Sequence, residues 1–552
     1  MTRQLFIVLA LLLFLSLNSQ IGKPWAWPID SPIVLTANYG ELRPNHFHAG
    51  LDFATGGQIN KPVYAAAEGY VSRIKVSSVG YGKCIYVTHP NNKVTVYAHL
   101  QSFGLKTDVL VKREQEAQQN YEVEILPSPF SVLVRKGEIL GMSGNTGGST
   151  GPHLHFEIRD EKSETPLNPL LFYRIADNSK PSVQALAIFS LADTTRPQVH
   201  KLLYTSNTTN DSLSISETSV TVNESILGLG FSGYDKVFPG GSPNNIFSVK
   251  VWYDDFLIYS HTLNNIDFSE MRYINEFTQN YQKYQLQKCF LPTLFPEKFQ
   301  HKEFNKGRIV LRDNDYHRIR FQFTDESGNS TFARFYLRTS EVTYYKEPSV
   351  KSSELLKCNK DYFVKKDGIY LYVPAGSVYY STPLIFENTL EGSGKLIILP
   401  SDVNLRNPVM VGFAIPSKHK SHKQKLVLKC GNSVYAPIVK NDSVYFAVKS
   451  FGWFQLASDS TRPVIRPVLS PRKIKKLKQI TSFSFQILDQ ASGIGRYKSF
   501  VNNTWVPAEY DAKSDLLTFY FDDDSPKGPK QLRVEVEDKV GNTSVLELQL
   551  PH

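Results

Sequence analysis

Two short segments of the chain carry residue types that could hold a metal ion. The first, residues 45–53, reads NHFHAGLDF and places His48 four residues before Asp52. Neutral imidazole and carboxylate groups are ligands that Zn²⁺ accepts, with bonds of about 2.0–2.2 Å. Gly50 lies between them and disfavours a helix, so we expect a turn that enters a strand to bring the two side chains together. This spacing alone does not distinguish a metal site from a chance match.

The second segment, residues 151–159, reads GPHLHFEIR. Its polar and apolar residues alternate, so on a strand His153, His155 and Glu157 share one face while the apolar residues between them point into the core. Two imidazoles about 7 Å apart at Cα can share one site, with one binding a metal and the other reaching a bound substrate. A structural pair of surface histidines is the alternative.

Two further segments lie between these. Residues 96–100 (VYAHL) place His99 at the end of an alternating strand, where we expect it to face as Tyr97 does. Residues 141–151 (GMSGNTGGSTG) contain five glycines in eleven positions. They lack the Gly-Lys-Ser/Thr ending of a phosphate-binding loop, so we interpret them as a groove wall that admits an extended peptide.

The elements around these segments are predicted to be short antiparallel strands. Residues 31–175 consist of alternating runs separated by Gly and Asn turns. Residues 107–119 are the exception and predict a short helix inserted between strands, which return at 131–134. The expected fold class is therefore mainly β.

The rest of the chain contains a near-repeat. Residues 320–335 and 533–548 each consist of an alternating strand, a tight turn with Asp and Gly-Asn, and a second alternating strand. This hairpin resembles the last strand pair of many bacterial immunoglobulin-like domains, and residues 489–495 resemble the loop that leads into them. We therefore predict immunoglobulin-like β-sandwich domains at 180–345 and 461–552, with another β-rich domain at 346–460.

Residues 1–20 are predicted to be a secretory signal peptide. Arg3 supplies a positive start, and the apolar run 5–17 is too short to cross a bilayer as a helix. A short uncleaved anchor is the alternative. No other long apolar segment occurs, so we expect no transmembrane segment in the mature chain.

The cysteines give no metal site. The four are widely spaced with no C-x-x-C motif, and both a Cys358–Cys430 disulfide and buried free thiols stay open.

Length and charge set broad limits. The 552 residues suggest three to four domains. The net charge of +10 would draw an exported protein toward anionic wall polymers or lipid head groups. The basic clusters at 418–425 and 472–478 lack interleaved aromatic residues or a recognition motif, so we expect no nucleic-acid partner.

Taken together and in order, the four segments resemble the lysostaphin-type, or LytM-like, zinc endopeptidases. That family carries H-x-x-x-D, a Tyr-x-His-Leu strand, Gly-Asn-Thr-Gly and Gly-Pro-His-Leu-His-Phe-Glu, and residues 62–69 (PVYAAAEG) also look like its second strand pair. The resemblance covers about residues 31–170. It implies that residues 21–175 form an antiparallel β-sheet metallopeptidase domain.

The resemblance also implies the site. His48, Asp52 and His155 would bind one catalytic Zn²⁺, and His99 and His153 would be the catalytic pair, with the general base not assigned between them. Three protein ligands leave a fourth position for water, as catalytic zinc requires. The substrate groove would be lined by Arg43, Asn45, Asn145 and Thr146.

The expected function is an exported zinc-dependent endopeptidase that hydrolyses peptide cross-links of bacterial peptidoglycan. We place it in the periplasm or cell envelope, with a Gram-negative source preferred. Its partners would be peptidoglycan peptides and, through the β-sandwich domains, other envelope proteins. Two alternatives are a catalytically silent regulator of wall amidases and an envelope scaffold or adhesion protein.

Overall fold

The structure is a computed structural model. It describes the following residues: 25–173, 175–192, 197–207, 211–237, 241–295, 301–303, 305–342, 355–388, 395–415, 417–469, 480–521 and 528–550. The predicted signal peptide and the basic cluster at 472–478 lie outside the described residues.

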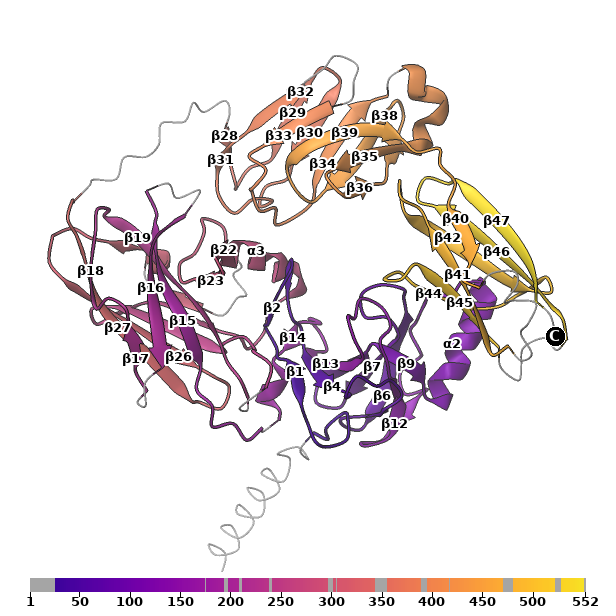
Figure 1. Ribbon diagram of the computed structural model, residues 1–552, viewed down its shortest axis with the longest axis horizontal. Helices are drawn as coiled ribbons and strands as arrows, with labels where there is room; N and C mark the ends of the chain where they lie inside the picture. Colours follow the sequence, from indigo (N-terminus) through magenta and orange to yellow (C-terminus); the bar gives the residue numbers. More distant parts are fainter. Residues whose placement is uncertain are drawn as a thin grey trace, which may run out of the picture.

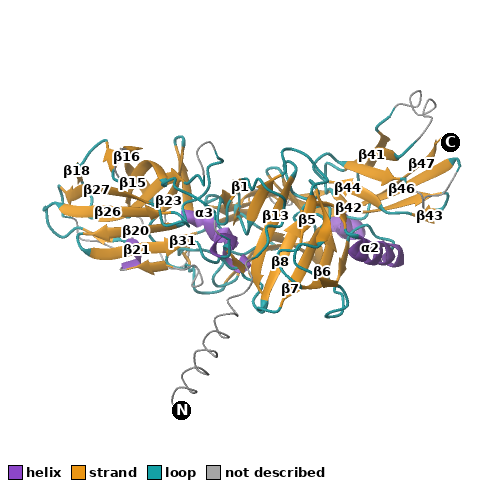
Figure 2. Cartoon of the chain, turned by 90° about the horizontal axis from the view of Figure 1, so that it is seen from below, coloured by secondary structure: helices purple, strands orange, loops and turns teal. Residues whose placement is uncertain are grey.

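The chain is mainly β, which confirms the expected fold class (Figure 2). Most described strands pair antiparallel, whereas β18 (Ser219–Val222) pairs with β27 (Ser330–Thr339) in parallel. The strands fall into four units, which we name the N-terminal unit (25–173), the second unit (175–342), the third unit (355–458) and the C-terminal unit (464–550). The domain boundaries predicted from the sequence stay predictions.

The N-terminal unit is built on a nine-stranded sheet and a three-stranded sheet. The apolar face of the larger sheet forms one core with the smaller sheet. The main path of the larger sheet runs β1 (Leu35–Ala37), β4 (Leu51–Ala54), β13 (His153–Asp160), β8 (Lys93–Ala98), β7 (Cys84–His89), β6 (Gly69–Val76) and β10 (Val123–Ile125), and the smaller sheet runs β5 (Pro62–Tyr64), β12 (Ile139–Ser143) and β9 (Leu100–Phe103).

The predicted helical insertion is present. Helix α2 (Leu105–Gln118) follows β9 and ends at Gln119, which adopts a left-handed conformation. Its buried residues are Thr107, Val111 and Gln115. The strand predicted at 131–134 is present only as β11 (Leu133–Val134).

The second unit consists of two sheets whose inner faces share one core, so they pack face to face. The first sheet runs β17 (Leu213–Ile215), β16 (Gln198–Asn207), β15 (Ser182–Ser190), β19 (Ile226–Tyr234), β23 (Tyr284–Lys288) and β22 (Thr278–Tyr281). The second runs β18, β27, β26 (His317–Thr324), β20 (Ser248–Tyr253), β21 (Phe256–Thr262) and β24 (His301–Glu303). The short helix α3 (Ile274–Phe277) precedes β22.

The third and C-terminal units are also pairs of sheets around shared cores. One sheet of the third unit runs β29 (Tyr362–Lys366), β30 (Ile369–Val373), β34 (Val409–Ala414), β38 (Ser443–Val448) and β37 (Ile438–Lys440). Its other sheet runs β32 (Ile385–Asn388), β33 (Lys395–Leu399), β39 (Gly452–Ser458), β35 (Leu426–Cys430) and β36 (Ser433–Tyr435). One sheet of the C-terminal unit runs β40 (Val464–Pro467), β41 (Ser482–Leu488), β45 (Leu516–Tyr520) and β44 (Ala508–Asp511). Its other sheet runs β43 (Thr504–Trp505), β42 (Ile494–Val501), β46 (Lys530–Asp538) and β47 (Thr543–Leu550). Both hairpins of the predicted repeat are present, as β26–β27 and β46–β47.

The units follow one another in a loop that returns the C-terminal strands to α2 and the N-terminal unit (Figure 1). Lys83 of the N-terminal unit forms an ion pair with Glu509 of β44 at 2.8 Å, and Tyr497 of β42 packs against the N-terminal core. On the other side, Phe47 shares a buried apolar cluster with Phe277 and Tyr379 of the next two units.

All four cysteines are free, and three of them are buried, so the Cys358–Cys430 disulfide is not formed. Across the part of the chain that the structure describes, no helix combines the length and apolar character needed to span a bilayer.

Candidate metal centre

A hairpin and a glycine turn carry His48 and Asp52 to the large sheet. The short strand β3 (His46–Phe47) pairs with β2 (Leu42–Arg43), and the chain then turns through Gly50 into β4. A Cβ atom on Gly50 would lie 2.2 Å from the carbonyl oxygen of Phe156, so only glycine lets this turn approach β13. The predicted turn that enters a strand is confirmed.

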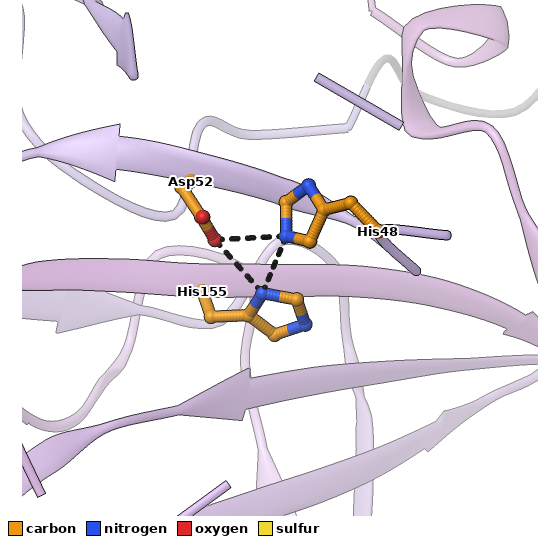
Figure 3. A group of neighbouring side chains, drawn as sticks. All are labelled: His48, Asp52 and His155. Carbon is orange, nitrogen blue, oxygen red and sulfur yellow. Dashed lines mark hydrogen bonds and ion pairs between the residues drawn. The ribbon is translucent and has the colours of Figure 1, made fainter. Parts of the chain in front are cut away.

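Strand pairing then places the third residue. In the β4–β13 register, Asp52 lies directly opposite His155. The His155 Nδ1 atom lies 2.8 Å from Asp52 Oδ1, and His48 Nε2 lies 3.0 Å from each of these two atoms. Figure 3 shows the three side chains pointing at one another, with Asp52 on β4, His155 on β13 and His48 on the turn that precedes β4.

The hydrogen bonds of the two rings suit a metal site. His48 Nδ1 donates to the carbonyl oxygen of Asn38 at 2.7 Å, and His155 Nε2 donates to Glu157 at 2.8 Å. The other nitrogen of each ring faces Asp52 and would offer its lone pair to a metal ion that replaces the proton between His155 and Asp52. Tetrahedral ligands at Zn²⁺ bond lengths lie about 3.4 Å apart, close to the observed separations. The residues fit a zinc ion.

The electrostatics of the cluster agree with this fit. Burial lowers the pKa of His48, which keeps it neutral. Burial opposes ionisation of Asp52, but His48, His153 and His155 together hold its pKa well below the usual value. Burial likewise opposes protonation of His155, but hydrogen bonds to Asp52 and Glu157 raise its pKa to about 9. The cluster thus favours one positive charge at its centre, which a divalent cation can supply in place of the proton.

Glu157 holds the His155 ring through the nitrogen that does not face Asp52. It is fully buried, and its carboxylate accepts hydrogen bonds from His155, from Arg159 Nε at 2.6 Å and from the Tyr81 hydroxyl at 2.5 Å. Burial opposes its ionisation, but Arg159 and His155 lower its pKa to about 2. A carboxylate that accepts from a ligand imidazole fixes its tautomer and orientation.

Sequence reasoning placed Glu157 on the face of His155 but gave it no role, and it missed Tyr81 and Arg159. The same alternation that identified His153 and His155 extends to Arg159 and could have included it. Tyr81 lies in the loop between β6 and β7, and no local pattern links it to β13.

His99 and His153 lie beside the cluster. Their ring centroids are 4.8 Å apart, and that of His99 is 5.8 Å from that of His155. His153 Nδ1 donates to the carbonyl oxygen of Gly151 at 2.8 Å, while its Nε2 is buried without a hydrogen-bond partner, 3.5 Å from Asp52 Oδ1. His99 Nδ1 donates to the carbonyl oxygen of Thr146 at 2.8 Å. Burial, then the nearby His155 and His153, lower the pKa of His99 to about 3, so this ring is neutral.

The expected facing of His99 is wrong. Tyr97 packs on Phe156 in the core, on the opposite side of the sheet from His155. His99 has a positive φ of 59° and lies between β8 and β9, so the alternation of the strand stops before it. This left-handed residue turns the ring to the face that carries His153 and His155.

Of the four residues predicted to line the groove, Arg43 and Thr146 contact the residues of the site, whereas Asn45 and Asn145 contact the neighbouring units. Arg43 donates to Asp52 Oδ2 at 2.5 Å, and Asn45 Oδ1 accepts from Asn275 of the second unit. The backbone oxygen of Asn145 accepts from Lys513 of the C-terminal unit at 2.6 Å. The Thr146 hydroxyl donates to the Leu100 carbonyl at 2.9 Å. Arg43 and Thr146 therefore position Asp52 and His99, and contact of the four with substrate stays a prediction.

Comparison with known proteins finds a family match over the part of the chain that carries the site. Residues 46–117 and 131–169 match the model of peptidase family M23, and the unmatched segment begins where α2 ends. The chain is 36% identical over 123 residues to the DD-carboxypeptidase/endopeptidase Mpg of Neisseria meningitidis serogroup B (strain ATCC 13091 / M2091), which is 22% of each chain. It is 30% identical over 138 residues to the peptidoglycan DD-endopeptidase ShyA of Vibrio cholerae, which is 24% of this chain and 26% of that one.

Among solved structures, the catalytic domain of lysostaphin from Staphylococcus simulans is 26% identical and aligns over 24% of this chain and 87% of that one, with a TM-score of 0.19. The chain spans about a fifth to a quarter of the length of these two curated relatives. The match to the family model lies in the segment that carries the cluster. Residues 46–169 therefore contain a match to peptidase family M23, and we name this segment the M23 domain.

Proposed function

We propose that the chain is a zinc-dependent endopeptidase that hydrolyses peptide cross-links of bacterial peptidoglycan. The observation that carries the proposal is the convergence of His48, Asp52 and His155 on one point with two further imidazoles beside it. Three protein ligands of this kind leave one position for solvent, which is the arrangement of catalytic zinc.

The chemistry divides between the ion and the side chains. Zinc held there would supply a Lewis acid for the scissile carbonyl and lower the pKa of water toward about 7. His99 and His153 each donate through Nδ1 to a backbone carbonyl, which leaves Nε2 able to accept a proton. One ring would take a proton from the attacking water and return it to the leaving amine as the C–N bond breaks. The other ring, in its protonated form, would donate through Nε2–H to the developing oxyanion.

The neighbouring residues keep these groups in place. Arg43 binds the Asp52 oxygen that does not face the histidines, so one carboxylate oxygen is directed at the metal position. Glu157 and the carbonyl oxygen of Thr146 orient His155 and His99. This preorganisation lets the groups act without rearranging at the moment of reaction.

The substrate class rests on relatives named as peptidoglycan endopeptidases, such as ShyA and ShyC of Vibrio cholerae. A D-Ala–diaminopimelate cross-link is the preferred bond, with glycine bridges as the alternative. Export to the periplasm or cell envelope follows from the predicted signal peptide at 1–20.

The test is digestion of purified peptidoglycan by the mature protein. Cross-linked muropeptides should disappear on incubation, a zinc chelator should stop this, and added Zn²⁺ should restore it. Mass spectrometry of the released fragments identifies the bond that is cut. A wild-type protein that binds one zinc ion but releases no fragments would contradict the proposal and favour the amidase-regulator alternative.

The catalytic pair is tested separately by His153→Ala. General acid–base catalysis contributes about 10²–10⁴-fold, so the variant should lose activity by that factor. Its zinc content, measured by plasma mass spectrometry, should stay at the wild-type value because His153 is not among the three ligands. His155→Ala is the matched comparison and should lose both zinc and activity.

A further inference from the structure

Two clusters of three aspartates lie outside the M23 domain. The first comprises Asp177, Asp235 and Asp325, and the second comprises Asp459, Asp489 and Asp538. Within each cluster, one carboxylate oxygen from every residue lies within 4.8 Å of the other two. The sequence analysis identified the hairpins that contain Asp325 and Asp538 but gave these side chains no ligand role.

The two clusters occupy equivalent places in their units. The first aspartate of each lies five residues before the first strand, β15 or β40, and a proline, Pro181 or Pro463, directly precedes that strand. The second aspartate directly follows the strand that pairs with this first strand: β19 pairs with β15, and β41 pairs with β40. The third stands at the turn of the β26–β27 or β46–β47 hairpin. Each cluster therefore joins the start of a unit to its last hairpin.

The hydrogen bonds around the first cluster show how it is held. Asn329 Nδ2 donates to Asp325 Oδ2 at 2.8 Å and to the backbone oxygen of Asp177 at 3.1 Å. The Thr331 hydroxyl donates to the Pro181 carbonyl at 2.7 Å. These contacts fix the backbone of the linker against the hairpin without using the carboxylate of Asp235.

The same contacts recur around the second cluster. Asn542 Nδ2 donates to Asp538 Oδ2 at 2.6 Å and to the backbone oxygen of Asp459 at 3.1 Å. The Ser544 hydroxyl donates to the Pro463 carbonyl at 2.6 Å. Two units with different sequences thus build one constellation twice.

Buried oxygens without partners point into these clusters. Asp235 is 1% exposed, and neither of its carboxylate oxygens has a hydrogen-bond partner within the described chain. In the second cluster, Asp459 is 2% exposed with Oδ2 unpartnered, and Oδ2 of Asp489 is buried and unpartnered as well. A buried carboxylate without a partner is strongly unfavourable unless a cation or a proton neutralises it.

No side-chain cation of the described chain fills this role, because no lysine, arginine or histidine forms an ion pair with any of the six aspartates. Burial, followed by the neighbouring Asp325 and Asp177, raises the pKa of Asp235 to about 7. Burial likewise raises the pKa of Asp325. The first cluster therefore concentrates negative charge that nothing in the described protein offsets.

We infer that each aspartate cluster is a calcium site. The side-chain donors are all oxygens, which suit hard cations, whereas the zinc cluster of the M23 domain has two imidazoles. Ca²⁺ binds oxygens at 2.3–2.6 Å, so ligands on opposite sides of one ion lie at most about 5 Å apart, as these do. Six to eight ligands are usual, and backbone carbonyls and water would complete the set.

The position of the sites gives them a role in the architecture. Asp177 lies four residues beyond the end of the M23-containing N-terminal unit, and Asp459 lies directly after the third unit. Calcium would therefore tie each inter-unit linker to the last hairpin of the unit that follows. This inference concerns the accessory units and does not depend on the peptidase activity.

The experiment uses the full mature chain with its zinc site loaded and calcium removed. Titration with CaCl₂ followed by isothermal calorimetry should give two calcium ions per chain. Asp235→Asn and Asp489→Asn should each bind one, and the double variant should bind none. Asp315→Asn, an exposed change in the second unit, is the matched control and should bind two. Absence of saturable binding at millimolar calcium, an unchanged stoichiometry in both variants, or preferential binding of Mg²⁺ would overturn the inference.

Thermal unfolding separates ligand binding from a purely structural role. Calcium at saturating concentration should raise the melting temperature of the wild type by at least about 3 °C. In calcium-free buffer, Asp235→Asn should melt no lower than the wild type, because it removes an unpaired buried charge, while its response to calcium should be reduced. An equal loss of melting temperature in both buffers would show that Asp235 is structural and would overturn its assignment as a ligand.

Discussion

Glu157 orients His155, one of the three proposed metal ligands. It lies below His155 and joins that imidazole to Arg159 and Tyr81 through one carboxylate. Arg43 orients Asp52 in the same way, by donating to one of its carboxylate oxygens. Neither residue is proposed to bind the metal, yet each determines which atom of its neighbour faces the metal position. At the scale of single residues, the site is therefore a set of ligands held by charged partners.

Replacing Glu157 with glutamine should weaken zinc binding. The amide keeps the shape but removes the charge opposite Arg159 and can present an N–H group toward His155 Nε2. Loss of such a partner costs about 10–100-fold in metal affinity. Competition with a chromogenic chelator measures this directly. Glu161→Gln, an exposed change just beyond β13, should bind zinc as the wild type does, and equal affinities in both variants would contradict the role of Glu157.

At the scale of elements, the glycine-rich segment 141–151 uses its backbone to position the ring of His99, which is proposed to be catalytic. Gly147 has a φ of 72°, and a Cβ atom there would lie 2.3 Å from the backbone nitrogen of Gly82. The preceding residue, Thr146, accepts from His99 through its carbonyl oxygen. The loop can therefore pack against the 80–82 turn because Gly147 has no side chain. This packing places the Thr146 carbonyl oxygen that orients His99.

We expect Gly147→Ala to disturb this loop. The left-handed backbone and the close contact with Gly82 should together cost at least about 1 kcal/mol in the free energy of unfolding. Peptidoglycan hydrolysis should fall at least tenfold while zinc content stays unchanged, because the three ligands lie on other segments. Denaturant unfolding and a digestion assay provide the two measurements.

Gly148→Ala is the control for this prediction. A Cβ atom on Gly148 would lie 3.4 Å from its nearest neighbour, the Gly80 carbonyl oxygen, which is ordinary contact. This variant should retain stability and activity. If Gly147→Ala behaved in the same way, the loop would not be the element that orients His99.

At the scale of the whole molecule, the accessory units contact the M23 domain on two sides. Asn275 of the second unit donates a hydrogen bond to Asn45 of the N-terminal unit. Lys83 of the N-terminal unit pairs with Glu509 of the C-terminal unit, and Lys513 of the C-terminal unit donates to the carbonyl oxygen of Asn145. Lys83 and Glu509 are both largely buried at this contact. The loop of units in Figure 1 is therefore closed by specific polar contacts next to the glycine-rich segment.

Reversing one charge should open this closure. In the Glu509→Lys variant, two lysines would face each other in a partly buried contact. Their like charges would repel, and neither ammonium group would have an opposite charge beside it. We expect a larger radius of gyration in small-angle scattering and faster proteolysis between the third and C-terminal units. Glu547→Lys makes the same charge change on an exposed position of β47 and should leave both measurements at the wild-type values. Identical scattering from the two variants would show that Glu509 does not hold the units together.

The sequence by itself determined the donor types, their order and the local geometry that depends on a short period. The alternation of residues 153–159 predicted one polar face, and Gly50 predicted a turn before Asp52. Both predictions are confirmed, because the period of a strand and the backbone freedom of glycine are properties of adjacent residues. The match to family M23 covers residues 46–117 and 131–169, which include both of these segments.

Only the tertiary structure decided which distant residues meet. The left-handed backbone at His99 reversed its expected face, and the pairing of β4 with β13 put Asp52 opposite His155. Asp177 and Asn329 are 152 residues apart and meet only because the β26–β27 hairpin folds back to the start of its unit. Such contacts follow from strand register and sheet packing over the whole chain, which no local pattern of residue types encodes.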